Sequence, residues 1–313
     1  MVDCKMANQG TDGLVSVIMP THNRCDLVEE TIDSLLRQTY KTIELIIIDD
    51  HSTDNTKKCI ERYVEEYDFI HYYMSEGWGA CAARNLGLLK SKGEYIQFMD
   101  DDDIVHEDFI KRRVEALQKD GQAGFATCNM SYFQGNLKNI VKYFRIDNIE
   151  HDIYNHLLRS ALPAPLFLFR RSTIEAIGFW DENCLRFQDI RYYHRLFLRS
   201  INGVWLSDYL YYVRIHEQSI SRRYDRKTIE SVLRVYNSIN IEWRAEHKQN
   251  LRLSRILFLQ STAFLIGNFS YDKCWILREF LNLAVSDLDG FIFFIRFLVQ
   301  KLIFSKKAVD YYI

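Results

Sequence analysis

Short apolar runs alternate with amphipathic segments over the first 130 residues. Five runs are the right length for buried strands: residues 15–19, 43–48, 70–73, 95–99 and 125–129. Four segments between them carry apolar side chains at helical spacing: residues 26–38, 54–67, 80–90 and 107–119. Strands and helices that alternate with short links predict a mainly parallel sheet with helices on both faces, and so an α/β fold. Pro20 is expected to stop the first strand.

The pattern changes twice further along the chain. From residue 132 to 165 it loosens around one predicted helix at residues 152–159. The following elements are predicted as strands at 166–169, 204–206 and 209–215, and as helices at 172–177 and 188–200. Beyond residue 225 the chain is helical, with no Pro and two Gly. We therefore expect a disordered lead-in (1–13), an α/β domain (14–224, with halves 14–130 and 131–224) and a C-terminal helical region (225–313).

Four consecutive aspartates, residues 100–103, follow the strand predicted at residues 95–99. Open α/β sheets bind ligands just past the carboxyl ends of their strands. Adjacent carboxylates repel one another, and a divalent cation such as Mg²⁺ or Mn²⁺ relieves this repulsion while also binding phosphate oxygens. A solvated acidic turn in which Asp103 caps the next helix is the alternative. It leaves three of the aspartates unexplained.

Two other polar residues lie at the same predicted edge. Asp50 ends the second strand, where a carboxylate can accept hydrogen bonds from a nucleobase N–H. Arg84, early in the helix at 80–90, can meet a diphosphate or a base edge. The alternatives are a helix-capping role for Asp50, for which Asp54 is better placed, and a solvated or salt-bridged Arg84.

Composition and charge narrow the function classes. The 313 residues have 48% hydrophobic content and a formal net charge of −2, which gives no general attraction to nucleic acid. Seven scattered cysteines without a C-x-x-C pair indicate reduced thiols rather than a disulfide framework or a zinc site. The polar N-terminus lacks a signal-peptide core, and no run reaches the roughly 20 apolar residues of a membrane span. A cytoplasmic location is expected.

Several motifs together resemble the family 2 glycosyltransferases. They are Val-Ser-Val-Ile-Met-Pro-Thr-His-Asn at 15–23, Gln-Thr-Tyr at 38–40, Ile-Asp-Asp-His-Ser-Thr-Asp at 48–54, Ala-Arg-Asn-Leu-Gly at 83–87 and Gly-Glu-Tyr-Ile-Gln-Phe-Met-Asp-Asp-Asp-Asp at 93–103. The resemblance covers residues 15–129 and continues to about residue 223. It implies a GT-A fold and transfer of a sugar from a nucleotide sugar, usually UDP-linked, with inversion at the anomeric carbon.

The resemblance assigns roles in the nucleotide-binding half. Thr21 and Asp50 correspond to residues that hold uracil, and Arg84 to one near the base or diphosphate. Asp100 and Asp102 match the D-x-D pair, with Asp101 between them near the ribose and Asp102 as the direct metal ligand. The extra aspartate leaves open a shift of one residue in this register.

The second half carries the remaining assignments. Gly-Phe-Trp-Asp-Glu at 178–182 and Arg-Phe-Gln-Asp-Ile at 186–190 are similar to family segments, which implies Asp189 as the catalytic base, although Gln188 stands where the family commonly has Glu. Asp189 as a helix cap is the alternative. In the segment at 211–223, His216 is a candidate metal or diphosphate ligand, and the alternative is that it is a structural histidine. Arg222 and Arg223 are candidate diphosphate clamps.

The acceptor side is less specified. The chain lacks the Gln-x-x-Arg-Trp sequence of processive synthases in the family, which favours transfer of a single sugar. The resemblance implies a glycan or lipid-linked acceptor in polysaccharide or cell-envelope synthesis. Residues 291–304 are apolar but interrupted by Arg296 and Lys301. Such a segment can lie in a membrane interface or pack on the protein, and we favour peripheral contact with the inner face of the membrane.

Three other functions fit parts of the sequence. A module that binds a nucleotide sugar or carbohydrate without turnover is favoured only by Gln188. A haloacid-dehalogenase-like phosphatase shares the spacing of Asp100, Asp102 and Ile104, but its nucleophile follows the first strand of its domain. A nucleotidyltransferase needs a Gly-rich, Arg-containing loop after strand one, and Pro-Thr-His-Asn at 20–23 is not such a loop.

Overall fold

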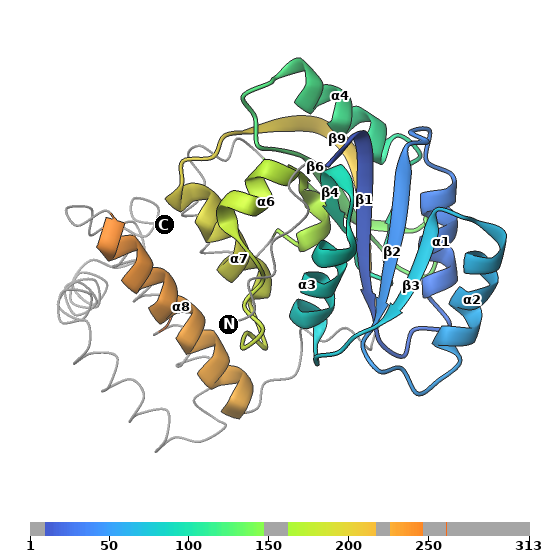
Figure 1. The fold of residues 1–313 in the computed structure, drawn as a ribbon, viewed down its shortest axis with the longest axis horizontal. Coiled ribbons are helices and arrows are strands. Elements are labelled where there is room, and N and C mark those ends of the chain that lie inside the picture. The colour runs from blue at the N-terminus through green and yellow to red at the C-terminus, as the bar shows by residue number, and fades with distance from the viewer. Residues whose placement is uncertain (1–9, 147–161, 217–225, 247–260, 262–313) are drawn as a thin grey trace. The chain divides into compact units, whose positions relative to one another are not determined.

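The structure, a computed structural model, describes residues 10–146, 162–216 and 226–246 and Ser261 (Figure 1). The strands are β1 Thr11–Thr21, β2 Ile43–Asp49, β3 Ile70–Met74, β4 Gly93–Phe98, β5 Ile104–Val105, β6 Phe125–Phe133, β7 Ile140–Phe144, β8 Leu168–Arg170 and β9 Gly203–Arg214. The helices are α1 Val28–Leu36, α2 Thr56–Glu66, α3 Ala80–Lys90, α4 Phe109–Lys119, α6 Arg171–Ile177, α7 Gln188–Leu198 and α8 Arg226–Glu246, with a 3₁₀ turn η2 at Ala164–Leu166.

The strands form one mixed sheet in the order β3-β2-β1-β4-β8-β6-β9-β5, with β7 paired to β6. Neighbours from β3 to β4 are parallel, which confirms the predicted α/β fold class, and antiparallel pairs begin at β8. Right-handed crossovers place α1 and α2 on one face of the parallel part and α3 on the other, as Figure 1 shows. All seven residues of β2 are buried, as expected for a parallel strand covered on both faces.

β1 is longer than predicted at both ends. Thr11 donates its N–H to the carbonyl of Lys92 at 2.7 Å, so residues 11–13 belong to the strand and not to a disordered lead-in. Residues 1–9 lie outside the described part. Pro20 does not stop the strand. The backbone N–H and C=O groups of Ile18 point towards β4, and those of every second residue, including Pro20, point the same way. Pro20 lies beyond Phe98, where β4 ends, so its missing N–H removes no hydrogen bond between the strands.

Two differences concern the second half of the sheet. The strands predicted at 204–206 and 209–215 are one strand, β9, with irregular register opposite Thr127 and Asn129. The bulges let polar Ser207 and Asp208 interrupt the apolar pattern without ending the strand. β7 was missed because it lies at an edge, with Val141 and Tyr143 exposed. The helix predicted at 152–159 lies outside the described residues.

The chain divides into two compact units. The first comprises Met1–Asp152, Ala161–Glu182 and Arg195–Ser221, and it contains the sheet. The second comprises Ile153–Ser160, Asn183–His194 and Arg222–Ile313. Within the second unit, Arg191 of α7 and Glu242 of α8 form a double hydrogen bond at 2.7 and 3.0 Å, which ties the two helices together. The expected domain halves at residues 130 and 224 stay a prediction.

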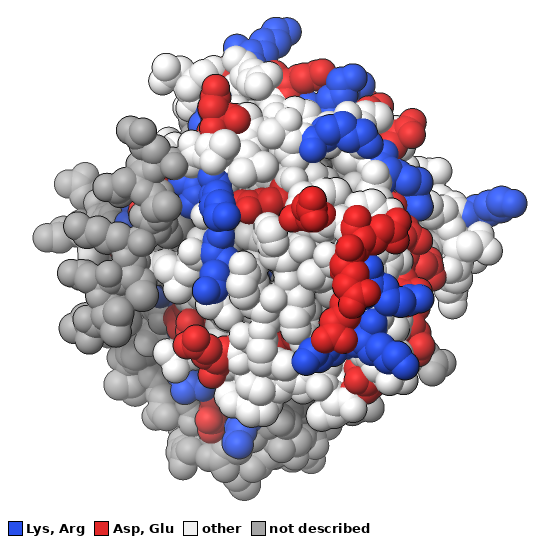
Figure 2. Space-filling model, turned by 45° about the vertical axis from the view of Figure 1, so that its right-hand side comes forward, with Lys and Arg blue, Asp and Glu red and all other residues white. Residues whose placement is uncertain are grey.

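The surface and thiols agree with the composition. Figure 2 shows acidic and basic side chains next to one another on one face, in keeping with the net charge of −2. The described cysteines are free thiols: Cys25, Cys59, Cys81, Cys128 and Cys184. Across the described ranges, no helix has both the length and the apolar character needed to cross a bilayer.

Candidate active site

Thr21, Asp50 and Gly79 meet where β1, β2 and α3 come together. The N–H of Asp50 donates to the carbonyl of Thr21 at 2.8 Å, which continues the pairing of β1 with β2 past the strand ends. The Oδ2 atom of Asp50 accepts the N–H of Gly79, directly before α3, at 2.8 Å. Gly79 has φ +88°, a left-handed conformation that glycine adopts without strain. Thr21 and Asp50, the predicted uracil-binding residues, therefore lie side by side.

The loop after β1 is fastened to the loop after β2. Asn23 has φ +52° and accepts the N–H of Thr53 on its side-chain oxygen at 2.8 Å. The N–H of Asn23 donates to Ser52 at 2.9 Å, and that of Arg24 donates to Thr56 at 2.8 Å. Asp54, predicted to cap the helix that follows, accepts the N–H of Thr56 at 2.9 Å. These bonds fix the main chain from which the Arg24 side chain extends.

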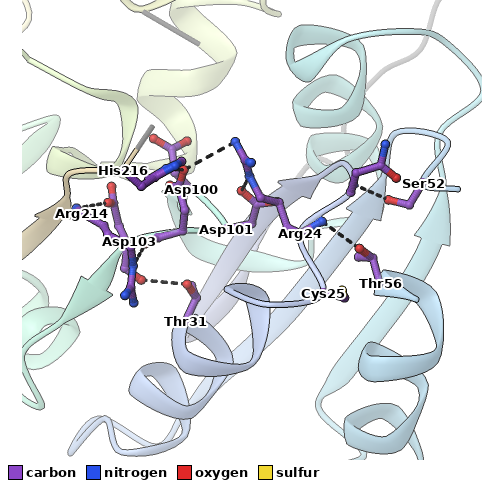
Figure 3. Close-up of polar contacts among 12 residues, drawn as sticks. Arg24, Cys25, Thr31, Ser52, Thr56, Asp100, Asp101, Asp103, Arg214 and His216 are labelled. Atoms are coloured by element: carbon purple, nitrogen blue, oxygen red, sulfur yellow. Dashed lines mark hydrogen bonds and ion pairs between the residues drawn. The ribbon is translucent and has the colours of Figure 1, made fainter. Parts of the chain in front are cut away.

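Sequence reasoning missed Arg24. Its guanidinium lies 3.6 Å from Asp101 and 3.8 Å from Asp102, and the side chain is only 12% exposed (Figure 3). The available signal was position, because Arg24 follows β1 at the same sheet edge as Asp50 and the aspartate run. A cation at this edge is placed to neutralise carboxylates or to bind phosphate.

The fourth aspartate differs in role from the other three. Asp103 is 4% exposed, and its carboxylate accepts the Tyr211 hydroxyl and the Arg214 N–H, the latter at 2.8 Å. Its carbonyl accepts the Thr31 hydroxyl at 2.8 Å. Burial, followed by the charge of Asp102, raises the pKa of Asp103 well above its usual range. Asp103 therefore joins the aspartate run to β9 and α1, and it is not a capping residue exposed to solvent.

The environment of Asp101 strongly perturbs the pKa of its carboxyl group. Burial raises its pKa to about 7, and the neighbouring charge of Asp102 adds to this. The Thr21 hydroxyl and the Arg24 guanidinium act in the opposite direction by favouring the ionised form. Burial of Asp101 therefore favours the neutral form of its carboxyl group, and a bound cation would favour the ionised form.

Asp102 meets a histidine from the other half of the sheet. Its Oδ2 atom lies 2.9 Å from Nε2 of His216, and its carbonyl accepts Nε of Arg214 at 2.8 Å. A carboxylate oxygen beside an imidazole nitrogen is a donor pair suited to Mn²⁺, which completes its shell with phosphate oxygens and water. Within the described residues, no group of three or more His, Cys, Asp or Glu side chains converges on a point that suits a metal. Asp102 and His216 are two side chains of this edge that could hold a cation.

Arg84 holds the first aspartate. Its Nη2 atom lies 3.1 Å from Oδ1 of Asp100, and its guanidinium stacks on Trp180 with 4.7 Å between the central carbon and the ring centroid. The next residue, Asn85, exchanges hydrogen bonds with the backbone of Trp180 at 2.8 and 3.0 Å and donates to Glu182 at 2.8 Å. Helix α3 therefore fixes both the aspartate run and the segment at 178–182.

The roles of the remaining predicted residues stay predictions. Asp189 lies in the first turn of α7, in the second unit, and its role as a base stays a prediction. Gln188 donates its side-chain N–H to the carbonyl of Cys184 at 3.0 Å. Arg222 and Arg223 lie outside the described residues.

Comparison with known proteins identifies relatives across most of the chain. GlyG, a glycosyltransferase of Streptococcus pneumoniae, is 29% identical over 72% of this chain and 78% of its own length. TarP of Staphylococcus aureus, a poly(ribitol-phosphate) β-N-acetylglucosaminyltransferase, is 33% identical over 65% of this chain and 63% of its own length.

Solved structures show the same fold. A crystal structure of S. aureus TarS 1–349 in complex with UDP-GlcNAc covers 83% of this chain and 74% of that one, with a TM-score of 0.63 and 21% identity. Mannosyltransferase PcManGT from Pyrobaculum calidifontis, in complex with GDP-Man and Mn²⁺, covers 88% of this chain with a TM-score of 0.53 and 17% identity. These likenesses confirm the predicted GT-A fold.

The family model described as glycosyl transferase family 2 matches residues 16–178, slightly more than half of the chain. The match spans β1 to α6, and thus Thr21, Asp50, Arg84 and the aspartate run. The resemblance seen in the sequence is thereby confirmed, and the chain belongs to the family 2 glycosyltransferases.

Proposed function

We propose that this protein transfers a single sugar from a UDP-linked donor to a hydroxyl of a glycan or lipid-linked acceptor, with inversion at the anomeric carbon. One observation carries the proposal. Three adjacent parallel strands, β1, β2 and β4, end at Thr21, just before Asp50 and just before the aspartate run, which therefore share one sheet edge. Open α/β sheets bind nucleotides at this edge.

The donor is inferred from the same edge and from the relatives. Asp50 and Thr21 present hydrogen-bonding groups where a nucleobase can lie, and Asp100, Asp101 and Asp102 follow on the next strand. A structural neighbour was crystallised with UDP-GlcNAc, and a relative is named as an N-acetylglucosaminyltransferase. Both support a UDP-linked amino sugar or hexose as the donor.

The reaction is a single displacement. The acceptor hydroxyl oxygen forms a bond to C1 of the sugar as the bond from C1 to the diphosphate oxygen breaks, so UDP leaves from the opposite face. Asp189 takes the proton of the hydroxyl. Asp102 and His216 would hold Mn²⁺ or Mg²⁺, which supplies positive charge beside the leaving diphosphate. Arg84 keeps Asp100 in place through the 3.1 Å ion pair.

The surroundings of the acceptor are part of the same proposal. A lipid-linked acceptor would bring the enzyme to the inner face of the membrane as a peripheral protein. The segment we assign to that contact, residues 291–304, lies outside the described residues. Arg222 and Arg223, also outside them, are proposed to clamp the diphosphate.

A second function, nucleotide-sugar binding without turnover, is favoured by Gln188. This residue replaces the glutamate that the family commonly has, and its side chain donates to the carbonyl of Cys184. An ionised glutamate has no N–H to donate, so the replacement changes what holds the start of α7.

Replacing Asp189 separates the two functions. With radiolabelled UDP-sugars and Mn²⁺, the wild type should transfer label to an acceptor, and NMR of the product should show inverted configuration. Asp189→Asn should lose transfer by about a hundredfold or more while retaining UDP affinity. Asp120→Asn, after α4, is the matched control and should behave as wild type. Unchanged turnover in Asp189→Asn would refute the base assignment, and UDP binding without transfer in the wild type would favour the second function.

A further inference from the structure

Arg24 combines a fixed main chain with a charged head group inside the aspartate run. Its N–H donates to Thr56 at 2.8 Å, and its carbonyl accepts the N–H groups of Leu27 and Val28, both at 2.9 Å. The preceding residue, Asn23, is bonded to Ser52. The main chain of Arg24 is therefore held at the sheet edge, and the guanidinium can change position only by rotation about the side-chain bonds.

The contacts of Arg24 with the carboxylates are longer than those of the neighbouring cations. Its Nε lies 3.6 Å from Asp101, and its Nη2 lies 3.8 Å from Asp102 (Figure 3). Arg84 approaches Asp100 to 3.1 Å, and His216 approaches Asp102 to 2.9 Å. The two Arg24 distances exceed hydrogen-bond length, so these attractions are Coulombic and do not depend on exact alignment. Water screens them little, because only 12% of the side chain is exposed.

One oxygen atom is shared by two roles. Oδ2 of Asp102 faces Nη2 of Arg24 and also Nε2 of His216. Asp102 and His216 are the two side chains that could hold a divalent cation. A divalent cation bound to this oxygen would repel the guanidinium, since both are positive. The same guanidinium has a planar fork of N–H groups that matches phosphate oxygens.

We propose that Arg24 is an exchangeable counter-ion of the donor site. Before the donor binds, Arg24 neutralises Asp101 and Asp102. When a divalent cation binds Asp102 and neutralises it instead, the Arg24 side chain turns to the diphosphate of the nucleotide sugar. This rests on the proposed function, because it needs both a metal and a diphosphate. It adds that Arg24 opposes metal binding on its own and favours nucleotide binding.

The opposite signs distinguish this role from a structural one. An arginine that only supports the fold would, when removed, weaken the binding of every ligand. An exchangeable counter-ion, when removed, leaves the carboxylates more attractive to a metal and the diphosphate without one of its partners. Two equilibrium measurements on the same variant therefore suffice.

The experiment uses the full chain and two probes, Mn²⁺ alone and UDP at saturating Mn²⁺. Binding of Mn²⁺ is followed by the paramagnetic resonance signal of the free ion, and binding of UDP by calorimetry. Arg24→Gln should bind Mn²⁺ more tightly by about tenfold and UDP more weakly by about tenfold. Arg24→Lys keeps the charge but loses the fork, so it should match wild type for Mn²⁺ and bind UDP more weakly.

Arg112→Gln is the matched control. Arg112 also pairs with an aspartate, Asp208, at 3.1 Å, but it belongs to α4 and lies outside the cluster. It should bind both probes as wild type does. Weaker binding of both probes by Arg24→Gln, or no change in either, would overturn the proposal. A wild type that binds no UDP at any Mn²⁺ concentration would overturn the proposed function itself, whereas UDP binding that Arg24→Gln leaves unchanged would overturn only the role of Arg24.

Discussion

The Nε2 atom of His216 lies 2.9 Å from the Oδ2 atom of Asp102, although 114 residues separate them in the chain. Pairing of β9 with β5 and β6 brings them together, and the Arg214 N–H secures the strand end on Asp103. An imidazole and a carboxylate so arranged can share a cation with the oxygens of a diphosphate. The sequence left two roles open for His216, a metal or diphosphate ligand and a structural histidine. The structure gives it a defined partner in Asp102.

His216 should be needed for metal-dependent nucleotide binding. We expect His216→Ala to weaken the binding of Mn²⁺ in the presence of UDP by about tenfold or more, because one of two protein donors is lost. Calorimetry of the ternary complex measures this. His71→Ala, on β3, serves as the control. If His216 only pairs with Asp102, its removal should leave the affinity for Mn²⁺ equal or higher.

Gly87 should tolerate no side chain. A Cβ atom there would lie 2.3 Å from Cγ2 of Ile18, because α3 packs closely on β1. We expect Gly87→Ala to lower the free energy of unfolding by about 1–3 kcal/mol through overpacking, despite the better helix propensity of alanine. Gly121→Ala is the control, since nothing lies within 4 Å of an added Cβ at that position. Equal denaturant midpoints for the two variants would show that α3 can shift away from β1.

The link between α7 and α8 should depend on acid. Burial alone would raise the pKa of Glu242, but hydrogen bonds from His194 and Arg191 outweigh it and lower the pKa to about 2. A lowered carboxyl pKa stabilises the folded state above the ordinary value of 4.5, and this stabilisation is lost as the pH falls from there towards 2. The difference in melting temperature between wild type and Glu242→Gln should therefore be large at pH 7 and shrink below pH 4.5. A difference that does not vary with pH would contradict this.

The predictable part of the fold is the part with the strongest periodicity. The four parallel strands and the helices between them follow from short apolar runs and 3.6-residue spacing, and α3 has its predicted bounds, residues 80–90. The predicted end at Pro20 failed because strand pairing, and not the residue alone, decides whether a missing N–H is costly. The sequence predicted two strands in place of β9, because the polar residues at the bulges resemble the polar residues of a turn.

The site was predictable where it depends on strand ends and not where it depends on pairing across the sheet. Asp50 and Asp102 could be placed because parallel strands bring their carboxyl ends to one edge. Arg24 was missed, although its position after β1 follows the same rule, because one arginine in a loop gives no periodic signal. The separation of Asp103 from the other aspartates required knowledge of Tyr211, which reaches it from a strand more than a hundred residues away. The place of Asp189 relative to this edge stays a prediction.

Equilibrium binding of UDP tests the central claim most directly. The claim is that Thr21 at the end of β1, together with carboxylates after β2 and β4, binds a nucleotide diphosphate with the help of a divalent cation. UDP should bind the wild type in Mn²⁺, lose its affinity in chelator and regain it when Mn²⁺ is restored, whereas Asp102→Asn should not regain it. Binding that is equal in chelator and in Mn²⁺, or absent under every condition, would contradict the account.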